Sequence, residues 1–219
     1  MLKRRLKGLI LGGPPAQDPP PGEPAPPDAS GAVYERHSHG LEQFSSHLQE
    51  SRELCILDLG GITQANVSFI TNLGHKLFSE DFLGAIDRQS GEASNPLLAE
   101  LLLRENLSYP EARFDGVLLW DALEFLPPPV LKATIERLFK ITKPGSYLLA
   151  FFHADEKAAL VPSYSYRITN AETINLTYRQ SRRPLQLFNN RGVERLFHRF
   201  NSVKFFLTRD NLREVIVRR

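Results

Sequence analysis

Three short, almost uninterrupted apolar segments constrain the fold of this 219-residue chain more than any other feature. They occupy residues 54–59, 114–120 and 147–152, and segments with helical periodicity, such as residues 127–142, lie between them. Strands that are apolar on both faces are typical of a parallel sheet with helices packed on each side. The sequence therefore predicts an α/β fold with a Rossmann-like, doubly wound, mostly parallel sheet.

The last third of the chain has a different pattern. Residues 163–178 alternate between apolar and polar side chains on both sides of a central turn, which predicts an inserted β-hairpin. Residues 202–219 alternate in the same way and predict two more strands joined by a turn. The mostly parallel sheet is therefore expected to end in an antiparallel C-terminal strand pair.

The first 33 residues are expected to lie outside a folded domain of residues 34–219. Residues 14–28 hold eight of the sixteen prolines, and proline neither continues a helix nor donates to a sheet. This stretch is predicted to be a disordered, Pro-rich linker, with binding of a protein partner as the functional alternative. Residues 1–13 are basic, and their apolar part is too short for an export signal, which leaves contact with a membrane or partner open.

Composition argues against several classes of function. The net charge of +2 gives no basis for a nucleic-acid partner, and no apolar run reaches the roughly 18 residues that span a bilayer. The single cysteine, Cys55, cannot form a disulfide or a cysteine zinc site within one chain, which favours a reducing, cytoplasmic location. His37, His39 and His47 occur without an accompanying cysteine or carboxylate pattern, so the sequence predicts no metal site.

Polar residues and glycines follow the predicted strands. Asp58, Gly60 and Gly61 come at the end of the first apolar segment, and a helix is expected to begin near Ala65. In doubly wound sheets the C-terminal ends of the strands open onto the crevice where ligands bind. Glycine lets the backbone approach a ligand closely, and a helix N-terminus offers free N–H groups to an anionic group. The layout is that of a strand–loop–helix nucleotide site.

Four segments, in this order, resemble motifs of the class I S-adenosylmethionine-dependent methyltransferases: "ILDLGG", "FSED", "FDGVLLWDALEFL" and "LFKITKPGSYLLAFF". The resemblance covers residues 34–219. It implies the class I methyltransferase fold, S-adenosylmethionine as the cofactor, and a small-molecule or protein methyl acceptor that the sequence does not identify.

The resemblance also implies roles for individual residues. Asp81, or alternatively Glu80, would accept hydrogen bonds from the ribose hydroxyls, and Asp58 would orient the loop or the amino group of the cofactor. The remaining cofactor contacts implied are those of Gly60, Gly61, Trp120 and Asp121. The sequence assigns no catalytic residue.

The chain departs from the family pattern in two places. Ile62 and Gln64 stand where further glycines are expected, and branched Ile62 is predicted to narrow the space for adenosine. The third strand is not identifiable, and residues 107–109 are the only candidate for it. Structural alternatives stay open: the two glycines as a tight turn, Asp81 as a helix N-cap, and Trp120 as a core residue.

Two functions are consistent with these patterns. The leading hypothesis is an S-adenosylmethionine-dependent methyltransferase; the alternative is a non-catalytic, methyltransferase-like binding or scaffold protein that uses the Pro-rich arm and the hairpin. A dinucleotide oxidoreductase is not supported, because "GGITQA" lacks the G-x-G-x-x-G pattern. His153 is a candidate general base, and one arginine cluster is either an anion site or a solvated face: Arg179, Arg182, Arg183 and Arg191.

Overall fold

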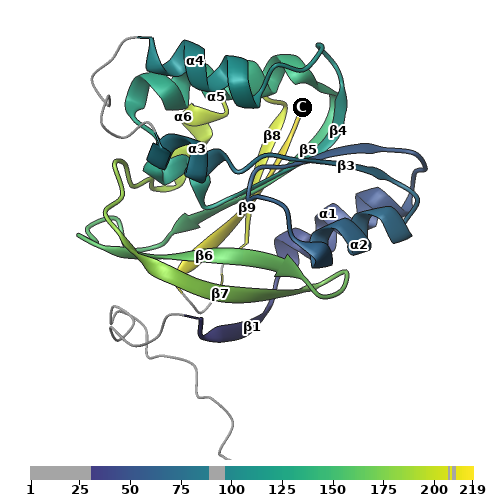
Figure 1. The fold of residues 1–219 in the computed structure, drawn as a ribbon, viewed down its shortest axis with the longest axis horizontal. Helices are drawn as coiled ribbons and strands as arrows, with labels where there is room; N and C mark the ends of the chain where they lie inside the picture. Colours follow the sequence, from purple (N-terminus) through teal and green to yellow (C-terminus); the bar gives the residue numbers. More distant parts are fainter. Residues whose placement is uncertain (1–30, 89–96, 207, 209–210) are drawn as a thin grey trace, which may run out of the picture.

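The computed structural model describes residues 31–88, 97–206, 208 and 211–219 (Figure 1). Its main element is a six-stranded sheet. Counted across the sheet, the first four strands run parallel to one another, and the fifth runs antiparallel to both of its neighbours. In spatial order the strands are β3 (Lys76–Ser79), β2 (Cys55–Asp58), β4 (Phe114–Trp120), β5 (Thr142–His153), β9 (Leu212–Arg218) and β8 (Ser202–Phe206). The predicted α/β fold with an antiparallel C-terminal pair is confirmed.

Helices cover both faces of this sheet (Figure 1). One face carries α1 (His39–Gln49) and α2 (Gln64–Asn72). The other face carries α3 (Phe82–Arg88), α4 (Leu98–Asn106), α5 (Pro128–Ile141) and α6 (Asn190–Leu196), with the 3₁₀ helix η2 (Ala122–Phe125) after β4. Two apolar clusters, one on each face, form the core. The apolar strands are thus buried on both sides, which accounts for their nearly uninterrupted hydrophobic sequences.

A second, antiparallel sheet of three strands packs on the α1 and α2 side. Its order is β1 (Val33–His37), β7 (Thr173–Arg182) and β6 (Val161–Ile168), and β6 with β7 forms the predicted hairpin. Side chains of the hairpin such as Tyr166 and Ile174 join the same core cluster as Trp120. The hairpin therefore covers the end of β4, and Figure 1 shows it lying along one side of the main sheet.

Buried Glu214 on β9 links the two sheets. Its Oε1 accepts hydrogen bonds from Nε and Nη2 of Arg36, at 3.2 and 2.7 Å. Its Oε2 accepts from Ser38 Oγ at 3.0 Å and from the backbone N–H of Gly40 at 2.6 Å. Both carboxylate oxygens are therefore satisfied although the side chain is fully buried, and the segment from β1 into α1 is fixed against the main sheet.

Several predictions of local structure need correction. The apolar spacing in residues 191–200 predicts a helix over that whole segment, but α6 ends earlier, at Leu196. Residues 107–109 form no strand, and no third parallel strand occurs between α3 and β4 among the residues that are described there. Asn95 and Pro96, which the sequence predicts as the cap and first position of a helix, lie outside the described residues, as do the basic and Pro-rich segments within residues 1–30. Within the described residues, no helix is both long and apolar enough to cross a bilayer.

Candidate functional site

The loop after β2 is organised by the buried carboxylate of Asp58. Its Oδ1 accepts hydrogen bonds from Gly60 N at 2.9 Å and from Trp120 Nε1 at 2.7 Å, and its Oδ2 accepts from Asn66 Nδ2 at 2.8 Å. Burial raises the pKa of Asp58, and these three donors oppose that rise. Asp58 thus orients the loop, as expected, but it does so with donors that belong to the protein.

Gly60 and Gly61 each meet a separate local requirement. Gly61 has a φ of +83°, a conformation that side chains other than glycine adopt at a cost. A Cβ on Gly60 would lie 2.5 Å from Cδ1 of Trp120. The glycine pair is therefore needed for a tight turn, which was the structural alternative, and for close packing of an indole ring against the backbone.

The two acids after β3 are arranged differently from each other. Glu80 accepts a hydrogen bond from the Tyr109 hydroxyl, and the pKa of Tyr109 is raised, first by burial and then by this carboxylate. Asp81 Oδ1 accepts from Gly84 N at 3.0 Å and so caps α3, as the alternative interpretation predicted. The Asp81 side chain is half exposed, and its Oδ2 lies 3.8 Å from Nη1 of the exposed Arg88, so a ligand at this carboxylate would compete with a solvent-exposed ion pair.

The end of β4 holds the most unusual conformation of the site. Trp120 has a φ of +52° and is almost completely buried. Its ring stacks on the ring of Tyr166 from the hairpin, with centroids 4.9 Å apart and planes 4° from parallel. A positive φ at a bulky residue costs about 1–3 kcal/mol and persists only where the surrounding contacts enforce it.

Asp121 follows Trp120 and is also buried. Burial raises its pKa to about 6, although the nearby His153 and the Tyr166 hydroxyl act in the opposite direction. Neither Oδ2 of Asp121 nor the hydroxyl of Tyr166 has a partner in hydrogen-bonding geometry among the described residues. Buried polar atoms without partners are rare in proteins, which makes this pair a candidate for ligand contact.

These residues surround one small cavity, here named the strand-end crevice. Its volume is about 10 Å³. The crevice lies where the chain reverses its direction of strand addition, because β3 joins one side of β2 and β4 joins the other. Its lining includes the sequence-predicted residues Gly60, Asp81, Trp120 and Asp121, and the hairpin residues Tyr164, Tyr166 and Arg179.

The crevice supplies suitable groups for an S-adenosylmethionine-like ligand but not the volume. About 10 Å³ holds at most one water, whereas pockets for cofactor-sized ligands measure about 300–1,000 Å³. The predicted narrowing by Ile62 is wrong, because that side chain is 79% exposed and does not line the crevice. Trp120 and Tyr166 fill the space instead, so the cofactor does not fit the crevice in this conformation.

His153 lies close to the crevice but is bound at both ring nitrogens. Nδ1 lies 2.6 Å from Oε2 of Glu124, and Nε2 donates to the carbonyl of Pro162 at 3.1 Å. Burial alone lowers the pKa of His153, but the hydrogen bond and charge of Glu124, with a contribution from Asp121, raise it overall. This pair holds η2, β5 and β6 together, and neither ring nitrogen is free for the general-base role considered from the sequence.

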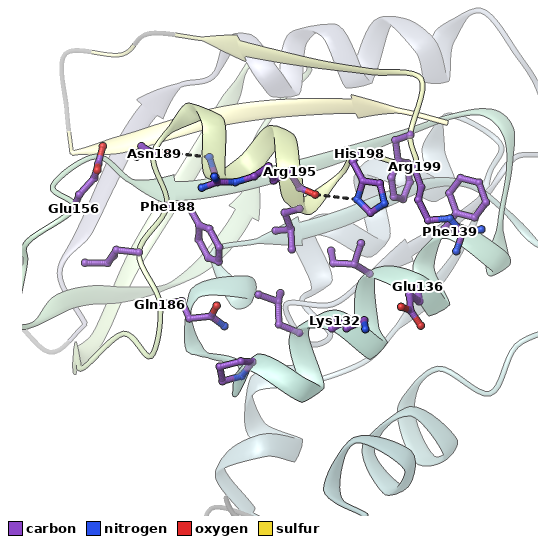
Figure 2. A pocket seen from close by; sticks show the side chains of 17 residues that line it. Lys132, Glu136, Phe139, Glu156, Gln186, Phe188, Asn189, Arg195, His198 and Arg199 are labelled. Atoms are coloured by element: carbon purple, nitrogen blue, oxygen red, sulfur yellow. Dashed lines mark hydrogen bonds between the residues drawn. The ribbon is translucent and has the colours of Figure 1, made fainter. Parts of the chain in front are cut away.

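A much larger cavity lies elsewhere, between α5, α6 and the segment before α6. Figure 2 shows this groove of about 870 Å³, with Lys132 and Glu136 on one side and Arg195 and Arg199 on the other. None of the residues expected from the sequence to contact the cofactor lines it, and it shares no lining residue with the strand-end crevice. Of the arginine cluster, Arg179 lines the crevice and Arg182 pairs with Asp87 at 2.6 and 3.0 Å.

The sheet is mostly parallel, places its switch point between β2 and β4, and ends in the antiparallel pair that the sequence predicted. The chain therefore has the Rossmann-like, doubly wound topology expected from the sequence. Among the described residues it lacks the third strand of the class I methyltransferase fold, so β3 lies at the edge of the sheet. No protein-family model matches the chain, and no curated protein sequence matches it.

Solved structures with similar folds include the PH0226 protein and several methyltransferases. The PH0226 protein from Pyrococcus horikoshii has 12% identity and a TM-score of 0.49, with 82% of this chain and 88% of that chain covered. A methyltransferase from Methanosarcina mazei has 16% identity and a TM-score of 0.46, covering 77% and 93%. The 1,6-didemethyltoxoflavin-N1-methyltransferase of Burkholderia thailandensis, solved with S-adenosylhomocysteine, has 13% identity and a TM-score of 0.44, covering 82% and 77%.

Proposed function

We propose that this protein is a methyltransferase that binds S-adenosylmethionine in the strand-end crevice. One observation carries the proposal: residues from the ends of three neighbouring parallel strands, Gly60, Asp81 and Asp121, line one cavity at the switch point of the sheet. This is the position at which doubly wound sheets bind their ligands. The methyl acceptor, whether a small molecule or a protein, is not identified.

The proposed contacts follow from the groups that remain available. The half-exposed carboxylate of Asp81 is the acceptor for the ribose hydroxyls, because Glu80 is already bonded to Tyr109. Asp121 and the hydroxyl of Tyr166, which interact with each other, supply polar groups to the lining of the crevice. We assign no catalytic residue, since holding a donor and an acceptor in line supplies a large part of the rate enhancement of a transfer reaction.

Cofactor binding requires the crevice to open. Trp120 must leave its stack on Tyr166 and its hydrogen bond to Asp58, either by a side-chain rotation or by a displacement of the hairpin. If the open state is populated at about 1%, the apparent affinity is about 100-fold weaker than that of an open site. The proposal therefore includes weak binding of the cofactor to the isolated protein.

A second candidate function is a methyltransferase-like binding module without catalysis. The specific observation in its favour is the closed crevice, in which Trp120 occupies the space above Gly60. The acceptor capacity of Asp58 is also satisfied by the protein itself. In this case the strand-end residues stabilise the fold and bind no nucleoside.

Isothermal titration with S-adenosylhomocysteine separates the two candidates. We expect saturable heat with a dissociation constant in the micromolar range, about −8 kcal/mol, and at least about tenfold weaker binding in Asp81→Asn. Asparagine caps helices as well as aspartate does, so this variant removes the charge without removing the cap. Asp155→Asn is the matched control, because Asp155 is also exposed and accepts a local backbone N–H.

The outcome that contradicts the methyltransferase proposal is equally concrete. Absence of heat at millimolar ligand, for a protein with a cooperative melting curve, supports the non-catalytic module. Binding that is the same in Asp81→Asn and in the wild type refutes the assignment of Asp81 to the ribose.

A further inference from the structure

We propose that His37, His39 and Glu42 form a Zn²⁺ site at the seam between the small sheet and α1. His37 ends β1, His39 begins α1, and Glu42 lies one turn further along that helix. Their ligand atoms lie within 4.8 Å of one another, and all three residues are exposed. The site lies outside the strand-end crevice, and the proposal is independent of cofactor binding.

The spacing of the three ligand atoms matches a metal ion. His37 Nε2 lies 3.2 Å from His39 Nδ1, His39 Nδ1 lies 3.3 Å from Glu42 Oε2, and the third side measures 4.0 Å. The circle through three points with these separations has a radius of about 2.1 Å, which equals a Zn–N or Zn–O bond length. A Zn²⁺ ion at the centre of this circle lies at bonding distance from all three atoms, and a small adjustment of the exposed side chains brings them from this planar arrangement to tetrahedral geometry.

Hydrogen bonds alone cannot pair all three of these atoms, whereas a metal ion can bind all three. Two of the three contacts use the same atom, Nδ1 of His39. A neutral imidazole nitrogen carries at most one hydrogen, so one proton cannot point at both His37 Nε2 and Glu42 Oε2. A cation accepts a lone pair from each of the three atoms at once, which removes this conflict.

The backbone that carries the ligands is fixed by buried contacts. Arg36 and Ser38, the neighbours of His37, both bond to the buried carboxylate of Glu214. Ser38 also caps α1 by accepting a hydrogen bond from Leu41 N at 3.0 Å. The ring of His39 stacks on Phe206, with centroids 6.2 Å apart. Preorganisation of this kind reduces the entropy that metal binding costs.

The ligand set selects the class of metal. Two imidazoles and one carboxylate suit Zn²⁺ and neighbouring transition metals, whereas Ca²⁺ and Mg²⁺ prefer sites built of oxygen atoms. Three protein ligands on an exposed surface leave the fourth tetrahedral position to water, as in open zinc sites. Lys204, whose ammonium group lies over the ring of Phe206, donates to Gln43 at 2.8 Å.

The sequence predicted no metal site because the histidines occurred without a carboxylate pattern. Helix formation supplies the missing carboxylate, since residues i and i+3 lie on one face and Glu42 is thereby placed beside His39. His47, the third histidine considered, does not join the cluster. It stacks on Tyr147 with ring centroids 4.3 Å apart.

The test is a Zn²⁺ titration of the full chain, purified without a histidine tag, by calorimetry at pH 7.5. We expect one Zn²⁺ per chain with micromolar affinity, and a loss of affinity of more than about tenfold in both His39→Ala and Glu42→Gln. His198→Ala is the matched control, because His198 is an exposed histidine outside the cluster. Replacement of Zn²⁺ by Co²⁺ should give visible d–d absorption that disappears in the same two variants.

Two outcomes overturn the proposal. One is the absence of binding at millimolar Zn²⁺, and the other is binding that persists unchanged in both ligand variants. Because the altered side chains are exposed, we expect the variants to fold, and their far-ultraviolet circular dichroism and melting curves verify this. A Zn²⁺-dependent rise in Tm that is present in the wild type and lost in the variants gives a second, independent readout.

Discussion

The buried carboxyl of Asp121 is predicted to lower the free energy of unfolding of the protein at neutral pH. Its side chain is almost fully buried, its Oδ2 has no hydrogen-bond partner among the described residues, and burial raises its pKa to about 6. A group whose pKa is higher in the folded state stabilises that state only while it is protonated. Its contribution is therefore complete below the unfolded pKa and is lost as the pH rises through about 6.

The size of the effect follows from the difference in pKa. The rise from 3.8 to about 6 is a little more than two pKa units, and each unit corresponds to 1.36 kcal/mol, so the ionised form is penalised by about 3 kcal/mol. Asp121→Asn removes the titration and keeps the shape of the side chain. We expect it to raise the free energy of unfolding by about 3 kcal/mol at pH 7.5 and by less than about 1 kcal/mol at pH 4.

Urea unfolding of the wild type and Asp121→Asn at pH 4, 5, 6 and 7.5 measures this difference directly. Asp155→Asn serves as the control, because Asp155 is an exposed aspartate outside the crevice. The reasoning is refuted if Asp121→Asn is no more stable than the wild type at pH 7.5, or if its advantage does not change with pH. A stabilised variant with weaker ligand binding would identify Asp121 as a residue kept for function at the expense of stability.

Three other substitutions give sharp expectations. Glu214→Gln breaks a buried charge pair with Arg36, and we expect a loss of about 3–5 kcal/mol in urea unfolding; a loss below about 1 kcal/mol would contradict the role of this network. Gly60→Ala should cost about 1–3 kcal/mol and shift the emission of Trp120, because the new Cβ would meet the indole at 2.5 Å. Gly61→Ala should cost about 1–2 kcal/mol through its positive φ alone, with unchanged emission, and equal emission changes in the two variants would refute this distinction.

Local sequence patterns were sufficient to predict most of the main sheet. The apolar runs identified three of the four parallel strands, β2, β4 and β5. Asp81 and Asp121, which the family resemblance assigned to cofactor contacts, line the same crevice because parallel strands end at one edge of the sheet. These predictions succeed because they depend on periodicity and on topology, both of which are written in short segments.

The features that sequence reasoning missed depend on contacts between distant residues. Arg36 and Glu214 are 178 positions apart, and β1 was not foreseen because its five residues form a strand only by pairing with β7. The buried position of the Trp120 ring also depends on distant residues. Asp58, which accepts a hydrogen bond from the indole, lies 62 positions earlier in the sequence, and Tyr166 of the hairpin, on which the ring stacks, lies later. No local sequence pattern could therefore predict that the rings of Trp120 and Tyr166 close the crevice.

The sole tryptophan of the chain allows the most direct test of the central claim, that the strand-end crevice opens to bind S-adenosylmethionine. Because Trp120 lines the crevice, fluorescence excited selectively at tryptophan, and not at the six tyrosines, reports on this site. In a titration with S-adenosylhomocysteine we predict a saturable change in Trp120 emission, with a weaker apparent affinity in Asp81→Asn. Emission that stays constant up to millimolar ligand, in a protein shown to be folded, would contradict the claim and favour a crevice that is permanently closed.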